Sequence, residues 1–207
     1  MSKWLWPVAV AGVAVAPVVA RTPRPIVVRP EGVADLADAV RVCRESELTG
    51  WDLVAYAQQL VHRKFTRFSI LSLWETPGRA FQNSRGYANQ YNTALWLVLR
   101  DLGFDAKRVF ATRVRQDQNP WWRMGHTWVQ VTLDGRTLDV CAGRADNRPG
   151  RVFFVPVTEV REFHDWTYWN TTSGMIVFTV YETWKAMLQR RSLPRWMHRD
   201  FGSTVEG

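Results

Sequence analysis

The segment from Ser84 to Phe104 constrains the fold of this chain more than any other. Its apolar residues recur at the spacing of one helical face, at positions 88, 91, 95, 98, 99 and 102. Gly103 follows the last of these positions and suits a left-handed C-terminal cap, while Gly86 lets the chain turn sharply into the helix. The spacing therefore predicts an amphipathic helix that begins near Ala88, with this small residue facing inward.

The residue at position 88 determines what chemistry the helix can support. A thiol at a helix N-terminus has a lowered pKa, because the end of the helix carries partial positive charge. The residue found there is Ala88, which cannot attack a substrate. None of the side chains that follow it, at positions 89 to 92, replaces a thiol.

Three motifs occur in the order found in one superfamily of thiol enzymes. The run Gly-Tyr-Ala-Asn-Gln-Tyr-Asn at 86–92, before a helix ending in Leu-Gly-Phe, resembles the nucleophile segment of the arylamine N-acetyltransferases. Those enzymes have Cys where this chain has Ala88. The same helix is similar to that of the wider transglutaminase-like superfamily. In this chain, Gly-His-Thr-Trp-Val at 125–129 resembles the His strand of that superfamily, and Thr-Leu-Asp-Val at 137–140 resembles its Asp strand. The resemblance covers residues 48–145. It implies an α+β fold with a papain-like, transglutaminase-like core, in which the nucleophile helix packs on an antiparallel β-sheet.

The turn at 134–135 allows the two motif strands to be aligned. Asp-Gly is a strong signal for a two-residue hairpin, which pairs position 133 with 136 and position 130 with 139. His126, Trp128 and Asp139 then project from the same side of the sheet. In this register His126 lies roughly 13 Å along the strand from the position opposite Asp139. A bulge or a shifted turn would have to close that gap, and Asp146 is the alternative partner.

The resemblance assigns a role to each of these residues. A thiol at the position of Ala88 would give its proton to His126, and Asp139 would orient the imidazole. The product would be a thioester, resolved by water, an amine or a hydroxyl. Three side chains are predicted to bind substrate or frame the oxyanion site: Gln90, Asn92 and Trp128. The expected substrate is a peptide, an amide or an acyl thioester, and the sequence indicates neither a metal nor a cofactor.

Ala88 leaves two explanations open. One is an inactivated Cys-to-Ala form of a thiol enzyme that performs acyl transfer, amide or peptide hydrolysis, or cross-linking. The other is a natural pseudoenzyme that binds a peptide, amide or acyl ligand. We favour the first on sequence alone, because His126, Asp139, Gln90 and Asn92 are all retained.

The net charge of +8 suggests an acidic partner or an anionic surface, but we favour the simpler explanation, a solvated basic surface that aids solubility. A nucleic-acid-binding protein is a third class of hypothesis. It rests only on charge and aromatic content, and the sequence has no signature of a nucleic-acid-binding fold, so we do not expect a nucleic-acid partner. The two cysteines, Cys43 and Cys141, are expected to be small buried apolar residues, although a disulfide between them is an alternative.

The chain is expected to have three parts. Residues 1–30 form an apolar segment and a Pro-rich linker, residues 31–191 the transglutaminase-like domain, and residues 192–207 a mobile basic tail. The apolar run at 4–20 resembles a signal peptide or a short membrane anchor, so membrane association through it is one interpretation. The other is an intracellular protein whose N-terminus packs on the domain, and the sequence leaves the two equally open.

The remaining secondary structure follows from periodicity and turn signals. We expect further helices at 32–44, 50–63 and 181–191. Strands are expected at 106–115, 125–133, 136–141, 152–157, 160–163 and 175–180. Thr49 and Asp52 resemble a capping box for the second of these helices, and residues 116–123 read as a polar loop.

Overall fold

The computed structural model describes residues 5–117 and 119–203, and the side chains of residues 5–11 and 119–123 are not described. The helices are α1 (Leu5–Arg21), the short 3-10 helix η1 (Pro30–Gly32), α2 (Leu36–Glu45), α3 (Gly50–Lys64), α4 (Pro77–Gln82), α5 (Ala88–Asp101) and α6 (Asp165–Leu188). The strands are β1 (Arg67–Ser69), β2 (Arg85–Gly86), β3 (Asp105–Gln116), β4 (Asn119–Leu133), β5 (Arg136–Val140), β6 (Phe154–Pro156), β7 (Arg161–Glu162) and β8 (His198–Asp200).

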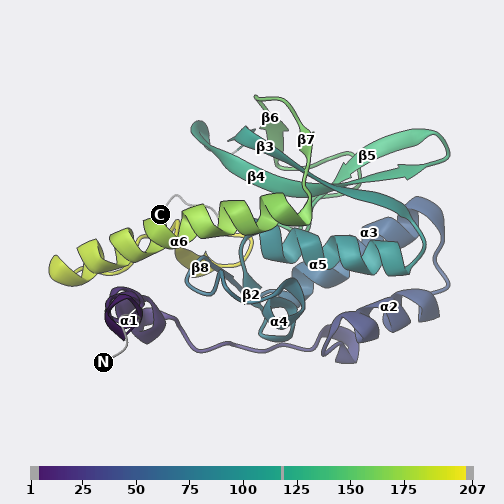
Figure 1. Ribbon diagram of the computed structural model, residues 1–207. Helices are drawn as coiled ribbons and strands as arrows, with labels where there is room; N and C mark the ends of the chain where they lie inside the picture. Colours follow the sequence, from purple (N-terminus) through teal and green to yellow (C-terminus); the bar gives the residue numbers. More distant parts are fainter. Residues whose placement is uncertain (1–4, 118, 204–207) are drawn as a thin grey trace.

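Helix α5 is the central element of the fold. It packs against β3 and β4 on one side and against α2, α3 and α4 on the other (Figure 1). The predicted helix is confirmed, since it begins at Ala88 and is followed by Gly103 with a φ of 93°. Its apolar face, including Leu95, Val98 and Leu99, lies in the main core. The periodic apolar residues therefore place the N-terminus of α5 beside the sheet.

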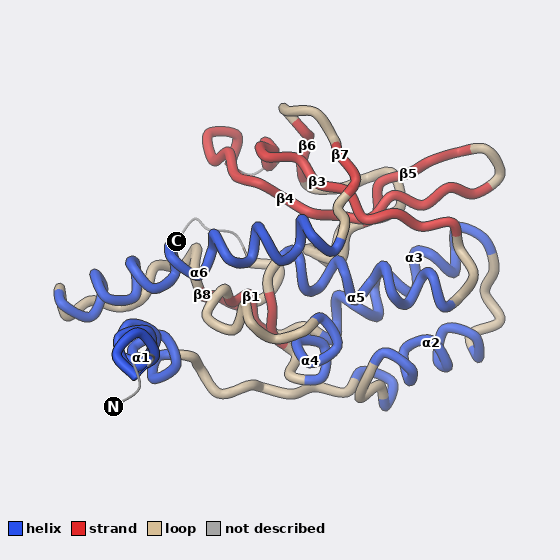
Figure 2. The backbone as a smooth tube through the Cα atoms, in the orientation of Figure 1, coloured by secondary structure: helices blue, strands red, loops and turns tan. Residues whose placement is uncertain are grey.

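The larger sheet has five strands, with the order β5-β4-β3-β6 and with β7 also paired to β3 (Figure 2). All of its strand pairs are antiparallel. The predicted hairpin register is confirmed, because Leu133 pairs with Arg136 and Gln130 with Asp139. A smaller three-stranded sheet joins β2, β1 and β8. The predicted α+β class, with a helix packed on an antiparallel sheet, is thus confirmed.

Gly86 is required by close packing at the entry to α5. A Cβ atom at this position would lie 3.0 Å from Gln90 Oε1 and 3.1 Å from the Phe65 ring. The residue therefore makes room for a capping interaction, because Gln90 Oε1 accepts a hydrogen bond from the backbone N–H of Tyr87.

The apolar N-terminal run forms most of α1, which packs against α6. Val18 is buried in a second, smaller core together with Ile70, Leu71 and Met197. Residue 4, the first of the predicted run, lies outside the described part of the chain. Among the described helices, none combines the length and the apolar character needed to cross a bilayer.

Four local expectations are wrong. The strand predicted at 175–180 is the middle of α6, because the helical context on both sides overrides the β propensity of a short apolar run. The loop predicted at 116–123 is largely strand, since β3 and β4 stay paired as far as Gln116 and Asn119, and residue 118 lies outside the described chain. Thr49 makes no side-chain capping bond to α3. The tail expected to be mobile contains β8, which pairs with β1.

Candidate functional site

The N-terminus of α5 opens on a cavity of about 490 Å³. Ala88 and His126 both line it, as the resemblance of the two motifs predicts. Much of the remaining wall is aromatic, with contributions from Phe68, Phe110 and Phe153. This volume falls in the range of ordinary small-molecule sites. The cavity is therefore large enough for a ligand, and it includes the position at which a nucleophile would stand.

His126 is a buried, neutral imidazole. Its side chain is 8% exposed, and the ring stacks at an interplanar angle of 13° on Trp128 and meets the edges of Phe153 and Phe154. Its Nε2 atom lies 3.4 Å from Cys141 Sγ. Burial lowers the pKa of His126 to about 3, so the ring carries no charge near neutral pH.

Cys141 provides the polar partner of His126. Its Sγ accepts hydrogen bonds from Asn92 Nδ2 at 3.5 Å and from the Gly143 N–H at 3.4 Å. Burial nevertheless raises the pKa of the Cys141 thiol to about 12, so it is protonated at neutral pH. The expectation that Cys141 is buried is confirmed, and both cysteines are free thiols. The contact between Cys141 and His126 is therefore one between two neutral groups.

Asp139 serves a different pair of residues. Its Oδ1 accepts hydrogen bonds from Trp128 Nε1 at 2.7 Å and from Gln130 Nε2 at 3.0 Å. Within the described part of the chain, no hydrogen bond joins either Asp139 or the exposed Asp146 to His126. Trp128 is fully buried and is not part of the cavity wall. The structure thus brings Ala88 and His126 together but does not bring a carboxylate to the imidazole.

Asn92 connects three parts of the core. Its Nδ2 donates to the carbonyl of Thr127 in β4, and its Oδ1 accepts from the backbone N–H of Ala142, after β5. The side chain is fully buried and does not line the cavity. Asn92 therefore fixes α5 against the hairpin that carries His126.

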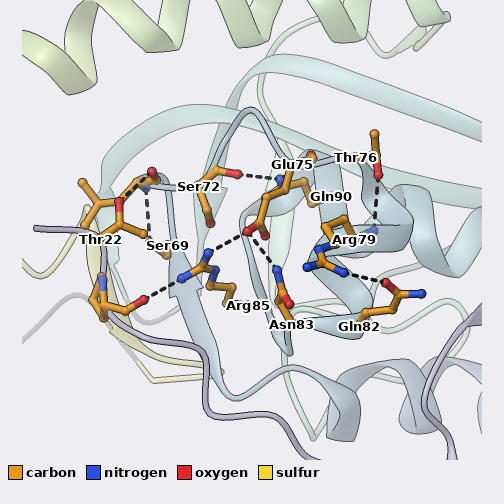
Figure 3. A network of polar contacts seen from close by, with 12 residues as sticks. Thr22, Ser69, Ser72, Glu75, Thr76, Arg79, Gln82, Asn83, Arg85 and Gln90 are labelled. Carbon is orange, nitrogen blue, oxygen red and sulfur yellow. Dashed lines mark hydrogen bonds and ion pairs between the residues drawn. The ribbon is translucent and has the colours of Figure 1, made fainter. Parts of the chain in front are cut away.

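Gln90 points away from the cavity, into the polar network shown in Figure 3. Its Nε2 donates to the carbonyls of Ser72 and Glu75 at 3.1 and 2.8 Å. Glu75 Oε1 in turn accepts from Asn83 Nδ2 and from the Arg85 guanidinium. Gln90 thus anchors the start of α5 to the segment that precedes it in sequence.

Sequence reasoning missed three polar residues of the cavity wall. Asn89 accepts a hydrogen bond from Thr127 Oγ1 at 2.8 Å and donates to Thr171 Oγ1 at 3.2 Å, so it joins α5 to β4 and α6. Arg144 and Arg199 also line the cavity. They come from segments far apart in the chain, and no local pattern marks either of them.

Comparison with known proteins supports part of this interpretation. Residues 55–138 match the family model described as the transglutaminase-like superfamily, a segment that includes Ala88 and His126 but ends one residue before Asp139. No curated protein matches the chain.

A crystal structure of a putative cysteine protease from Cytophaga hutchinsonii is similar, with 10% sequence identity and a TM-score of 0.43. The similarity covers 62% of this chain and 49% of the other, so it spans about half the length of that protein. The similarity to the transglutaminase-like superfamily rests on the sequence match over the central segment, residues 55–138.

Proposed function

We propose that this chain is a catalytically silent binding protein, which holds a small ligand in the cavity at the N-terminus of α5. The observation that carries the proposal is the environment of His126. Its Nε2 atom faces the protonated thiol of Cys141, where a thiol enzyme needs a group that stabilises an imidazolium. The nucleophile position is Ala88. The chain therefore lacks both a nucleophile at position 88 and a group that stabilises a charged His126, which are two of the three functions of a catalytic triad.

Burial adds to this argument. A thiolate–imidazolium pair requires His126 to be charged, but its burial against aromatic rings favours the neutral ring. The cavity has the size of a ligand site and keeps polar groups, such as Asn89, in its wall. These features suit binding better than acyl transfer.

The residues that favoured an inactivated enzyme on sequence alone have structural partners. Gln90 caps and anchors α5, Asn92 joins α5 to the hairpin, and Asp139 holds Trp128 and Gln130. Each would be kept for folding in a protein without activity. Their retention therefore does not distinguish a recently inactivated enzyme from a pseudoenzyme.

A thiol enzyme with Cys at position 88 is the second candidate. Its support is the match over residues 55–138 and the shared cavity of Ala88 and His126. Such an enzyme would form a thioester and transfer the acyl group to water or an amine, acting on a peptide, an amide or an acyl thioester. The resemblance to arylamine N-acetyltransferases stays a prediction.

The proposal is tested by filling the cavity. We expect the parent chain to bind an uncharged solvatochromic dye such as Nile red, and Ala88→Phe to reduce this binding by about tenfold or more, because the ring occupies the cavity. Ala145→Phe, at an exposed loop position, is the matched control and should bind as the parent does. Equal dye binding by the Ala88→Phe protein, with folding verified by circular dichroism, would overturn the proposal.

A further inference from the structure

The cavity contains a buried cation for which the described part of the chain provides no counter-charge. Arg144 is 9% exposed and lines the cavity, with its guanidinium 4.5 Å from the centre of the Phe153 ring. None of the hydrogen bonds or ion pairs among the described residues involves its side chain. The described residues of the cavity wall include no Asp or Glu.

Arg199 gives the same cavity a second guanidinium. It stacks 3.8 Å from the centre of the Phe68 ring, and its described hydrogen bonds go only to the backbone carbonyls of Ser203 and Arg195. Arg199 is therefore held in place by neutral groups. Its charge adds to that of Arg144 in the field that an incoming ligand meets.

A buried cation without an anion is unfavourable, and stacking on an aromatic ring offsets only part of that cost. The guanidinium presents donors in a planar fork that fits carboxylate and phosphate oxygens. Phe153 contacts both Arg144 and His126, since the centre of its ring also lies 5.5 Å from that of the imidazole. The cationic end of the cavity is thus one aromatic ring away from the imidazole.

We propose that the ligand of this cavity is an amphipathic oxyanion, whose carboxylate or phosphate is bound by Arg144 and Arg199 and whose apolar body lies along the aromatic wall. This inference rests on the proposed binding function and names the chemical class of its ligand. Arg144 supplies the specificity for the anion, and the aromatic residues supply the contact area.

Isothermal titration of the full chain with ligands below their micellar concentrations tests the inference. Dodecanoate and dodecyl phosphate are the two anionic arms, and the uncharged dye is the reference. We expect Arg144→Gln to weaken binding of the anions by about tenfold or more, because charge-assisted hydrogen bonds are lost, while dye binding changes less than about twofold. Arg151→Gln, which removes an exposed charge in the same region, is the matched control and should leave both anion binding and dye binding unchanged. The affinity of Arg144→Lys for the anions should lie between those of the parent and Arg144→Gln proteins.

The outcomes separate the two proposals. Equal affinity of the parent and Arg144→Gln proteins for both anions, with dye binding intact, overturns the anion site and leaves the binding function standing. Dye binding that is the same in the parent and Ala88→Phe proteins overturns the binding function itself. A preference for one anion over the other identifies the oxyanion.

A second observation, independent of the cavity, concerns α6. A helix of a water-soluble domain normally buries its apolar face and exposes its polar one. Helix α6 departs from this pattern, since it buries Thr172, Thr179 and Thr183 beside Tyr168 and Ala186. Five of its large apolar side chains are well exposed: Trp166 (79% exposed), Trp169 (52%), Val177 (72%), Tyr181 (59%) and Leu188 (74%).

These exposed residues follow a helical repeat, so they form one stripe along a helix about 36 Å long. The neighbouring helix α1 adds the exposed Val13 and Val19. Exposed arginines stand close in sequence to both helices, Arg190 just after α6 and Arg24 just after α1. Trp and Tyr with flanking arginines are typical of helices that lie in a membrane interface, where the cations attract anionic lipids.

We infer that the stripe on α6 docks the protein on an anionic bilayer surface, with the helix axis in the plane of the membrane. This differs from the interpretation of residues 4–20 as an anchor, because the main contact is made by α6. The charge of the whole chain, +8, favours the same surface.

Cosedimentation of the full chain with phosphatidylcholine vesicles, with and without phosphatidylglycerol, tests this inference. We expect binding to the anionic vesicles that falls by at least about tenfold in the Trp166→Ser/Val177→Ser double variant, because two large apolar side chains no longer bury surface in the membrane interface. The matched control is Val155→Ser/Val157→Ser, which removes two exposed valines at and just beyond β6 and should bind as the parent does. Unchanged sedimentation of the α6 variant overturns the inference. The inference is also overturned if the chain does not bind vesicles but forms a dimer that the α6 substitutions disrupt, because a second copy of the chain would then cover the stripe.

Discussion

The two sides of the α5 N-terminus differ in whether their charged groups have a counter-charge. On one side, Gln90 belongs to a network in which Glu75 Oε1 accepts hydrogen bonds from Asn83 and from the guanidinium of Arg85, its ion-pair partner (Figure 3). On the other side, Ala88 faces a cavity with a neutral imidazole and two guanidinium groups that have no described counter-charge. The network fixes the helix, whereas the guanidinium groups of the cavity have no counter-charge among the described residues of its wall.

This contrast shows why retained polar residues are a poor guide to catalysis here. Gln90 and Ala88 are two positions apart on the same helical turn, yet only Ala88 lines the cavity. Within the segment 55–138 that matches the superfamily model, Gln90 therefore has structural partners, whereas Ala88 faces the cavity.

Breaking the network should have the largest effect on stability. Glu75 and Arg85 form an ion pair whose side chains are 10% and 12% exposed. Glu75→Gln leaves a buried guanidinium without its counter-ion, and we expect a loss of about 3–5 kcal/mol in the free energy of unfolding, measured in urea. Glu159→Gln, in an exposed pair with Arg161, should change it by less than about 1 kcal/mol. A loss of similar size in both variants would contradict the contrast.

Lowering the pH should reduce the free energy of unfolding through His126, on the cavity side of α5. The pKa of His126 is lowered by burial to about 3, below the ordinary value of 6.5, so the unfolded state binds the proton more readily. Its contribution to stability is complete above pH 6.5 and decreases as the pH falls toward 3, by about 2 kcal/mol between pH 6.5 and pH 5. His62 and His198, whose pKa values burial also lowers, act in the same direction.

The pH effect is measured by urea unfolding at several pH values. His126→Gln removes the contribution of His126 to the pH dependence, so the free energy of unfolding of this variant should change less between pH 6.5 and pH 5 than that of the parent. An identical pH dependence in the parent and His126→Gln proteins would show that the imidazole is not buried as described.

Gln58 allows the cost of unpaired polar groups to be measured away from both regions. Its side chain is fully buried, and neither amide atom has a hydrogen-bond partner within the described part of the chain. Gln58→Leu removes this penalty, and we expect an increase of about 1 kcal/mol in the free energy of unfolding. Destabilisation in the same assay would mean that the amide has a partner.

The smallest effect is expected at the nucleophile position itself. Ala88→Ser adds one hydroxyl to a side chain that faces the cavity, so the free energy of unfolding should change by less than about 0.5 kcal/mol. A loss above 2 kcal/mol would place residue 88 in a packed core.

Local signals predicted the parts of the fold that depend on neighbours in sequence. The periodicity of α5 and the Asp-Gly turn at 134–135 were sufficient for the helix and for the hairpin register, whereas the prediction that Ala88 and His126 share one site came from the resemblance of their motifs to the superfamily. The predicted register already placed Gln130 opposite Asp139 and Trp128 on the same face, but it did not show that Asp139 bonds to these two side chains and not to His126. The partners of Gln90 could not be predicted, because they are backbone carbonyls of an irregular segment. The helix at 175–180 and the position of Arg144 depend on tertiary packing, which local propensity does not encode.

The most direct test of a silent site is the alkylation rate of Ala88→Cys by iodoacetamide as a function of pH, with the labelled residue identified by peptide mass. Without a charged imidazole, the rate should fall steadily as the pH is lowered, and His126→Gln in the same background should change it by less than about twofold. A fast rate that persists down to pH 5 and drops at least about tenfold with His126→Gln would reveal a thiolate–imidazolium pair. That result would contradict the silent site and establish the thiol enzyme.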